Sequence, residues 1–252
     1  MSRTLSCTAL ADFPIVAPGD DLAALIQQSL NQQCEPQDGD VIVIAQKVVS
    51  KAEGRYFKLS EVAASDAAHA LAAQADKDPA LAQLILDESK EVVRVRPGVV
   101  IVEHKLGYVH ANAGIDRSNV RDGDNEVLLL PVDSDASAKQ IKQHLKVTLN
   151  VDVAVIINDS AGRAWRNGTC GMVIGSAGLV PLVDMVGEAD MQGRTMEVTT
   201  VAVADELAAA ASYMMGQGAE GCPVVLIRGA DWQASDEGSG SLIRDKSMDL
   251  FR

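Results

Sequence analysis

Apolar residues recur along the chain with two spacings, and these spacings predict an alternation of helices and strands. Between residues 20 and 32 apolar side chains return every three or four positions, which is the period of an amphipathic helix. Residues 41–44 form a short β-branched run of the kind found in buried strands. The same reasoning predicts helices over 60–75, 79–89, 137–149 and 199–215, and strands over 92–95, 99–102, 127–130, 153–157, 172–174 and 224–227. We therefore expect an α/β protein of mixed α+β character.

The composition is that of a globular protein with an aliphatic core. Hydrophobic residues make up 47% of the 252 residues, but aromatic residues only 3%. The formal net charge of -13 argues against a nucleic-acid partner, because a phosphate backbone would be repelled. No apolar run approaches the roughly 18 residues of a membrane span, and no signal peptide is recognisable. We expect a cytoplasmic protein with neither a membrane nor a nucleic acid as partner.

The four cysteines are Cys7, Cys34, Cys170 and Cys222. They are widely spaced and include no CxxC pair. This pattern favours reduced, mostly buried thiols over a disulfide framework or a zinc site.

The end of the chain differs in composition from the rest. Residues 234–241 read ASDEGSGS, which is small, polar and rich in glycine and serine. Such a composition is typical of linkers and of loosely held termini. We expect one folded unit over 1–232, followed by a loose tail over 233–252.

The common nucleotide and hydrolase motifs are absent from the sequence. It contains no GxxxxGK[ST], no GxGxxG after a predicted strand, no GxSxG and no HExxH. Any nucleotide chemistry therefore requires a less common binding arrangement.

Four polar segments lie beside apolar runs and are candidates for that arrangement. In the first, Lys47 and Lys51 follow the strand predicted over 41–44 and share a face if a helix begins there. Two ammonium groups at the end of a buried strand fit phosphate, although a solvated lysine pair has the same spacing. In the second, residues 110–119, Asp116 and Asn119 are suited to metal and nucleotide contacts, and helix capping is the alternative.

The third segment begins where the strand predicted over 153–157 ends. Asp159 stands where α/β proteins often place a magnesium or manganese ligand, with Ser160 and Arg163 behind it; an Asx turn is the alternative. The fourth segment, 215–223, has three glycines between a predicted helix and a predicted strand. It allows close backbone approach to phosphate, although a helix C-cap followed by a turn reads the same way.

Together these segments resemble one known family. The runs GDVIVIAQKVVSKAEGR, HANAGIDRSNV, INDSAGRAWRNGTCG and EVTTVAVADELAAAASYMMGQGAEGCPVVLIRG, with FPIVAPGDDL near the start, closely resemble the coenzyme F420-0:L-glutamate ligases, which are gamma-glutamyl ligases. The resemblance extends over about residues 10–229, in the family's order and spacing. It implies a two-lobed α/β fold and an intertwined homodimer. Some relatives carry a fused nitroreductase-like domain, and we expect this chain to be the stand-alone form.

The resemblance also implies the roles of individual residues. Asp116 and Asp159 resemble the carboxylates that hold one divalent ion, Mg or Mn. By the same resemblance Asp116, Asp159 and Lys51 are expected to be catalytic. Ser160, where the family usually has threonine, and Gln217 resemble ligands of a second divalent ion. The implied GTP contacts are Asn119; Phe13, Pro14, Ile15 and Val16; Gln46, Lys47 and Lys51; and Met215, Gly216, Gln217, Gly218, Ala219, Glu220, Gly221 and Cys222. A monovalent cation, K, is a further candidate.

The implied activity is amide-bond formation. The F420-0 carboxylate would attack the γ-phosphate of GTP to give an acyl phosphate, and the glutamate amine would then displace phosphate. A second round would add a further gamma-linked glutamate. The alternatives are an amide ligase that acts on a different acid and a non-catalytic deazaflavin-binding protein. The residues that bind glutamate stay open, with Arg163, Arg166 and His110 as candidates by charge.

Overall fold

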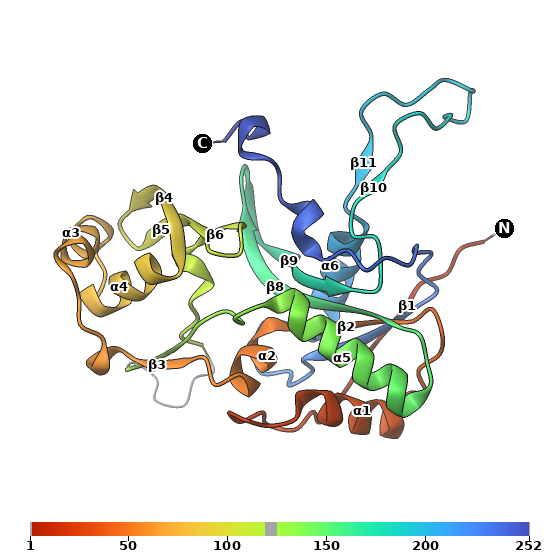
Figure 1. Ribbon diagram of the computed structural model, residues 1–252, viewed down its shortest axis with the longest axis horizontal. Coiled ribbons are helices and arrows are strands. Elements are labelled where there is room, and N and C mark those ends of the chain that lie inside the picture. The colour runs from red at the N-terminus through yellow and green to blue at the C-terminus, as the bar shows by residue number, and fades with distance from the viewer. Residues whose placement is uncertain (1, 119–124, 252) are drawn as a thin grey trace.

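The computed structural model describes residues 2–118 and 125–251, and its centre is one twisted sheet (Figure 1). The strand order is β1-β12-β2-β8-β9, in which β2 and β8 are parallel and all other neighbours are antiparallel. The strands are β1 (Ser6–Ala9), β2 (Val41–Ala45), β8 (Ala154–Arg163), β9 (Arg166–Ala177) and β12 (Val224–Arg228). β8 and β9 form a hairpin that runs past the end of β2.

Helices cover both faces of this sheet, which explains why its central strands are apolar throughout. On β2, Ile42 and Ile44 pack into a cluster with α1 (Leu22–Gln33), α2 (Gln46–Ala52) and α5 (Ser134–Leu149). Val41 and Val43 face the other way, into a cluster with α6 (Val203–Met215). Alternate residues of β2 thus belong to different clusters, as the pleat of a strand requires.

α6 packs closely on the sheet because its inner face is made of small residues. Ala204, Ala208 and Ala211 are fully buried. A Cβ added at Gly171 of β9 would overlap the carbonyl oxygen of Ala208. This close approach sets the distance between α6 and the sheet, and with it the position of the loop that follows the helix.

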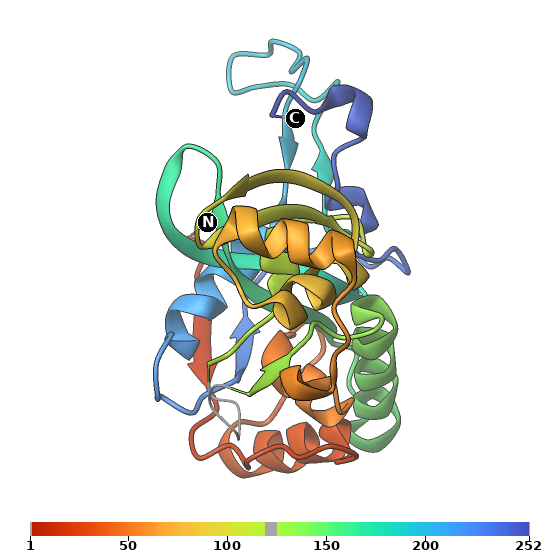
Figure 2. The ribbon, with the colours of Figure 1, turned by 90° about the vertical axis from the view of Figure 1, so that its left-hand side faces the viewer.

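A second hydrophobic cluster forms beside the central sheet, and Figure 2 looks onto it. Its elements are α3 (Asp66–Ala75), α4 (Pro79–Asp87), the β4-β5-β6 sheet and the β3-β7 pair. Their bounds are β3 (Tyr56–Lys58), β4 (Ser89–Arg96), β5 (Val99–His104), β6 (Val109–Ala111) and β7 (Glu126–Leu128). The side chains of Ser65 and Asp78 accept hydrogen bonds from backbone amides in the first turns of α3 and α4, so local capping starts both helices.

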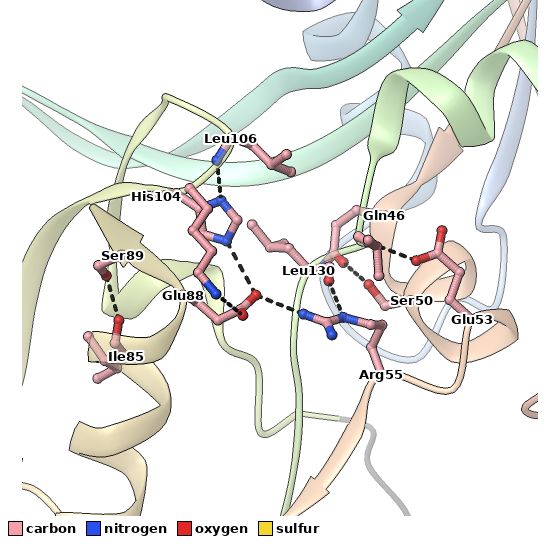
Figure 3. Close-up of polar contacts among 12 residues, drawn as sticks. Gln46, Ser50, Glu53, Arg55, Ile85, Glu88, Ser89, His104, Leu106 and Leu130 are labelled. Atoms are coloured by element: carbon pink, nitrogen blue, oxygen red, sulfur yellow. Dashed lines mark hydrogen bonds and ion pairs between the residues drawn. The ribbon is translucent and has the colours of Figure 1, made fainter. Parts of the chain in front are cut away.

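A buried carboxylate joins the second cluster to the central part of the chain (Figure 3). Glu88 Oε2 accepts a 2.7 Å hydrogen bond from Nη2 of Arg55, which follows α2, and lies 3.7 Å from His104 Nε2. Lys105 Nζ contacts the other oxygen at 3.4 Å. Burial by itself would raise the pKa of Glu88, but the nearby His104 ring and the charges of Arg55 and Lys105 outweigh it and lower the pKa to about 2.

Most predicted elements are present, and the differences have local causes. The helix predicted over 60–75 begins only at Asp66, because a 3-10 turn, Leu59–Glu61, and an extended stretch precede it. Strands β8 and β9 are longer than predicted, because they continue as a hairpin through polar residues. No disulfide joins the four cysteines, which are free thiols of intermediate burial. Within the described chain no helix is both long and apolar enough to cross a membrane.

The expectation of a loose tail is wrong for the residues after 232 that the structure describes. Ser239 is buried, and its N–H donates to Asp135 Oδ1 at 2.9 Å. Lys246 pairs with Glu91, and the Phe251 ring lies 6.0 Å from that of Trp165 at the turn of the β8-β9 hairpin. Near this segment a two-stranded arm, β10 (Val183–Asp184) and β11 (Thr200–Val201), projects from the body (Figure 1). The division at residue 232 stays a prediction.

Candidate active site

The topology brings four separate segments to one end of the central sheet. β2 and β8 are parallel, and Ala45 pairs with Asn158, so their carboxyl ends lie together. β12 is antiparallel to β2, which puts the loop before β12 at the same end; Ala45 N–H donates to Pro223 O at 2.8 Å. β1 is antiparallel to β12, so its last residues also reach this end, where Leu10 N–H donates to Val224 O at 2.9 Å. Ligand sites commonly form at such strand ends.

A cavity of about 760 Å³ lies at this end, and it has the size of a nucleotide-binding site. The sequence-predicted residues that line it are Phe13, Pro14, Ile15 and Val16; Gln46, Lys47 and Lys51; Asp116, Asp159 and Ser160; and Met215, Gly216, Gln217, Gly218, Ala219, Glu220, Gly221 and Cys222. Asn119 lies outside the described residues. Prediction from sequence missed Ala45 and Ser212, which line the cavity from the end of β2 and from α6.

One wall of the cavity carries an ion pair between two of the predicted residues. Lys47 Nζ lies 2.7 Å from Asp116 Oδ2 and donates to Ser118 Oγ at 2.7 Å. The Ser118 N–H donates to Asp116 Oδ1 at 2.6 Å. Burial raises the pKa of Asp116, but the hydrogen bonds from Lys47 and Ser118 outweigh it and lower the pKa below its ordinary value. Asp116 is therefore ionised at neutral pH, as a metal or phosphate-organising site needs.

The second carboxylate lies on β8 and is held from both sides. Asp159 Oδ1 accepts the Ser160 N–H at 2.8 Å, and Oδ2 lies 2.9 Å from Nε2 of the buried His110. Burial lowers the pKa of His110, but its interaction with Asp159 outweighs burial and raises the pKa. Asp159 and Ser160 are ladder residues of β8, paired with Met172 and Gly171, so the alternative of an Asx turn leaving the strand is wrong.

The glycine-rich loop after α6 contributes the opposite wall. Gln217 Nε2 donates to Ser160 Oγ at 2.9 Å and lies 3.3 Å from Ser212 Oγ, so the loop is tied to β8. Gly216 has φ of 73°, and an added Cβ would overlap the Glu220 carboxylate. Glu220 Oε2 in turn accepts the Gly218 N–H at 2.8 Å. The loop conformation therefore requires glycine at position 216.

The donor set around the cavity fits a hard divalent cation. Asp116 and Asp159 supply carboxylates, Ser160 a hydroxyl and Gln217 an amide oxygen, and oxygen ligands are those that Mg and Mn prefer. Across residues 2–118 and 125–251 no cluster of three or more His, Cys, Asp or Glu side chains could hold an ion. The protein ligands would therefore form a partial shell that needs oxygens from a bound phosphate or from water to complete it.

Three residues considered for glutamate binding lie outside the cavity lining. Arg163 and Arg166 flank the exposed turn of the β8-β9 hairpin, where Arg163 Nη1 donates to Gly168 O at 3.1 Å. His110 contacts Asp159 from beneath the cavity wall. Their assignment to glutamate stays a prediction.

The protein has a mixed α/β fold with an oxygen-rich cavity at the ends of its central strands. Comparison with known proteins identifies the family. The model of the F420-0:gamma-glutamyl ligases matches residues 11–229, and the chain belongs to this family. The coenzyme F420:L-glutamate ligase of Methanothermobacter thermautotrophicus is 47% identical over 98% of this chain and 99% of its own length. The protein of the same description from Methanopyrus kandleri is 44% identical over 94% of this chain and 93% of its own length. The one from Halorubrum lacusprofundi is 41% identical over 97% of this chain and 94% of its own length.

Proposed function

We propose that this protein is a GTP-dependent ligase that joins L-glutamate to F420-0 by an amide bond and then adds further gamma-linked glutamate in coenzyme F420 biosynthesis. One observation carries the proposal. The segments whose sequences resemble the family are separate in the chain, yet they meet around one nucleotide-sized cavity that presents Asp116, Asp159, Lys47 and Lys51 together. Membership of the family gives the reaction class, and the volume of the cavity is of the size that a nucleotide co-substrate would need.

In this proposal the reaction has two steps. A carboxylate oxygen of F420-0 attacks the γ-phosphorus of GTP, GDP leaves, and an acyl phosphate remains. The glutamate amine, having lost a proton, then attacks the acyl carbon, and inorganic phosphate leaves as the amide forms. Positioning and charge neutralisation are the main tasks of a protein in phosphoryl transfer.

The residues of the cavity divide these tasks. Asp116 and Asp159 would hold one divalent ion and Ser160 and Gln217 a second, and bound metal ions neutralise charge on the transferring phosphoryl group. Lys47 and Lys51 would bind phosphate oxygens directly. The Met215–Cys222 loop would follow the nucleotide with its backbone amides. The carboxylates explain how a chain of net charge -13 can bind anions, because they recruit the cations that recruit the phosphates.

The assembly is proposed to be a two-lobed, intertwined homodimer in the cytoplasm. Large apolar side chains are exposed on the β10-β11 arm and on the last residues of the chain, among them Met191, Val198 and Leu250. Apolar surface of this kind is what a partner subunit would cover. Light scattering of the purified protein tests the dimer, and a mass of one chain at micromolar concentration would contradict it.

The activity is tested by incubating the protein with F420-0, L-glutamate, GTP and manganese. We expect GDP release and a product heavier by one glutamyl unit in the mass spectrum. A gain in mass with a different acid in place of F420-0, and none with F420-0, would favour a related amide ligase. A protein that binds deazaflavin but shows no metal-dependent GTP binding by calorimetry would be a carrier, and the proposal would fail.

A further inference from the structure

His110 is a buried polar residue that contacts the candidate site without lining it. It is 8% exposed, and its Nε2 lies 2.9 Å from Asp159 Oδ2. It does not contribute to the cavity wall, whereas Asp159 does. His110 therefore acts on Asp159 and does not touch what the cavity holds.

The contact connects two different parts of the fold. His110 is on β6, the edge strand of the β4-β5-β6 sheet, and pairs there with Val102. Asp159 is on β8 of the central sheet. The second carboxylate, Asp116, follows β6 along the chain and forms an isolated bridge with Leu128 of β7, so the two carboxylates come from different parts of the fold. Their separation depends on how β6 is held against β8.

Contacts with β5 and β7 hold the segment between His110 and Asp116. Asn112 has φ of 52°, and its side-chain oxygen accepts the Val100 N–H at 3.0 Å. A Cβ added at Gly114 would meet the side chain of Leu130 at 2.6 Å. Asp116 itself exchanges two 2.9 Å backbone hydrogen bonds with Leu128. The segment is therefore tied to β5 and β7, and these contacts fix where Asp116 lies relative to His110.

We propose that His110 is a positioning residue that orients the Asp159 carboxylate and sets its distance from Asp116, so that both can bind one divalent cation. The inference rests on the proposed function, which supplies the cation. The Ser160 N–H holds Asp159 Oδ1 and His110 holds Oδ2, so the carboxylate has one orientation, and each oxygen keeps a lone pair for the ion. Loss of a residue that orients a metal ligand commonly weakens metal affinity by about 10–100-fold.

Three substitutions separate this role from simple packing. His110→Ala removes the imidazole that contacts Asp159. His110→Gln places an amide N–H near the position of Nε2, whereas His110→Asn has a shorter side chain whose amide falls near the position of Nδ1. His104→Ala is the matched control, because His104 is also a buried histidine in the same sheet but contacts Glu88 instead of Asp159.

The measurement is Mn²⁺ binding, by electron paramagnetic resonance of the free ion, with a non-hydrolysable GTP analogue present. We expect His110→Ala and His110→Asn to raise the Mn²⁺ concentration for half-saturation by about 10-fold or more, and His110→Gln to stay within about 3-fold of wild type. His104→Ala should lower the melting temperature without changing Mn²⁺ binding. In turnover, His110→Ala should raise KM for Mn²⁺ more than it lowers kcat.

Two results would overturn the inference. Wild-type affinity in His110→Ala, or equal weakening in the Gln and Asn variants, would show that His110 only fills space. In both cases the wild-type protein still binds Mn²⁺ and nucleotide, so the proposed function stands. A wild-type protein that binds neither would overturn both proposals together.

Discussion

The Lys47 ammonium lies 2.7 Å from Asp116 Oδ2, in the place where a cation would be expected beside a carboxylate ligand. Lys47 also donates to Ser118 Oγ, so its position is fixed by two partners. A divalent ion bound to Asp116 has to compete with this ammonium group. A phosphate that enters with the ion offers Lys47 a new partner, so metal and nucleotide should bind more tightly together than either does alone.

Replacing Lys47 should therefore have opposite effects on the two ligands. In Lys47→Met we expect Mn²⁺ alone to bind several-fold more tightly, because the competing charge is gone. GTP should bind at least about 10-fold more weakly, since a charge-assisted hydrogen bond contributes about 1.5–3 kcal/mol. Isothermal titration with each ligand measures both effects.

Lys58→Met is the control for Lys47, because Lys58 is an exposed lysine that pairs with Glu61 at 3.5 Å and does not line the cavity. It should leave both affinities unchanged. Weaker Mn²⁺ binding in Lys47→Met would contradict the competition and would place Lys47 in a purely supportive role.

Asp159→Asn tests the metal site with little change in shape. The amide keeps the volume of the side chain but loses the charge that a divalent ion needs. We expect ligation to fall by at least about 100-fold, since a bound metal stabilises the transition state by several kcal/mol. The rate of GDP release measures the loss.

Asp231→Asn serves as the control, because Asp231 is a surface carboxylate that lies far outside the cavity lining. It should keep full activity, and both variants should unfold cooperatively on heating. Near-normal turnover in Asp159→Asn would remove Asp159 from the metal site.

Gly216→Ala tests the shape of the loop between α6 and β12. Gly216 has φ of 73° and ψ of -178°, a backbone region nearly confined to glycine that costs another residue about 1–3 kcal/mol, and the new Cβ would overlap the Glu220 carboxylate. We expect the loop to shift and GTP affinity to fall by about 10-fold or more. Gly240→Ala is the control, because nothing lies within 4 Å of its added Cβ, and it should change neither affinity nor stability. Unchanged GTP binding in Gly216→Ala would show that the loop is not part of the nucleotide site.

Local patterns predicted the residues of the site better than they predicted its assembly. The strand over 41–44 and the polar residues directly after it are readable from their side chains, and Gln46 does begin a helix. The parallel pairing of β2 with β8 brings Ala45 beside Asn158. Hydrophobic periodicity describes only neighbouring residues, so it cannot predict a pairing between strands so far apart in the sequence. Family resemblance supplied the grouping that periodicity could not.

Two errors show where tertiary contacts override local composition. Residues after Ile157 are polar and glycine-containing, yet they continue β8 because β9 satisfies their backbone groups. The Gly/Ser-rich stretch near the C-terminus is held because Asp135, in the first turn of α5, accepts hydrogen bonds from the N–H groups of Ser239 and Ser176 at 2.9 and 2.8 Å. Its partner is distant in sequence, so composition alone predicts the wrong outcome.

The Arg55–Glu88 pair predicts how stability depends on pH. The pKa of Glu88 falls from 4.5 to about 2 on folding, so the folded state binds this proton less well than the unfolded state does. The contribution of Glu88 to the free energy of unfolding is fully present above about pH 5 and is lost as the pH falls from there towards 2. Because the side chain is only 12% exposed, this contribution is on the order of 2–3 kcal/mol.

Glu88→Gln should therefore lower the melting temperature at pH 7 and flatten its decrease between pH 5 and pH 2.5. The neutral amide cannot form an ion pair with the partly buried Arg55 guanidinium, which loses its Glu88 counter-charge between the second cluster and the central part of the chain. Glu61→Gln, at an exposed pair with Lys58, is the control and should follow the wild-type profile. Differential scanning calorimetry across this range measures both variants. Parallel profiles for wild type and Glu88→Gln would show that other carboxylates dominate the acid transition and that Glu88 has an ordinary pKa in the folded protein.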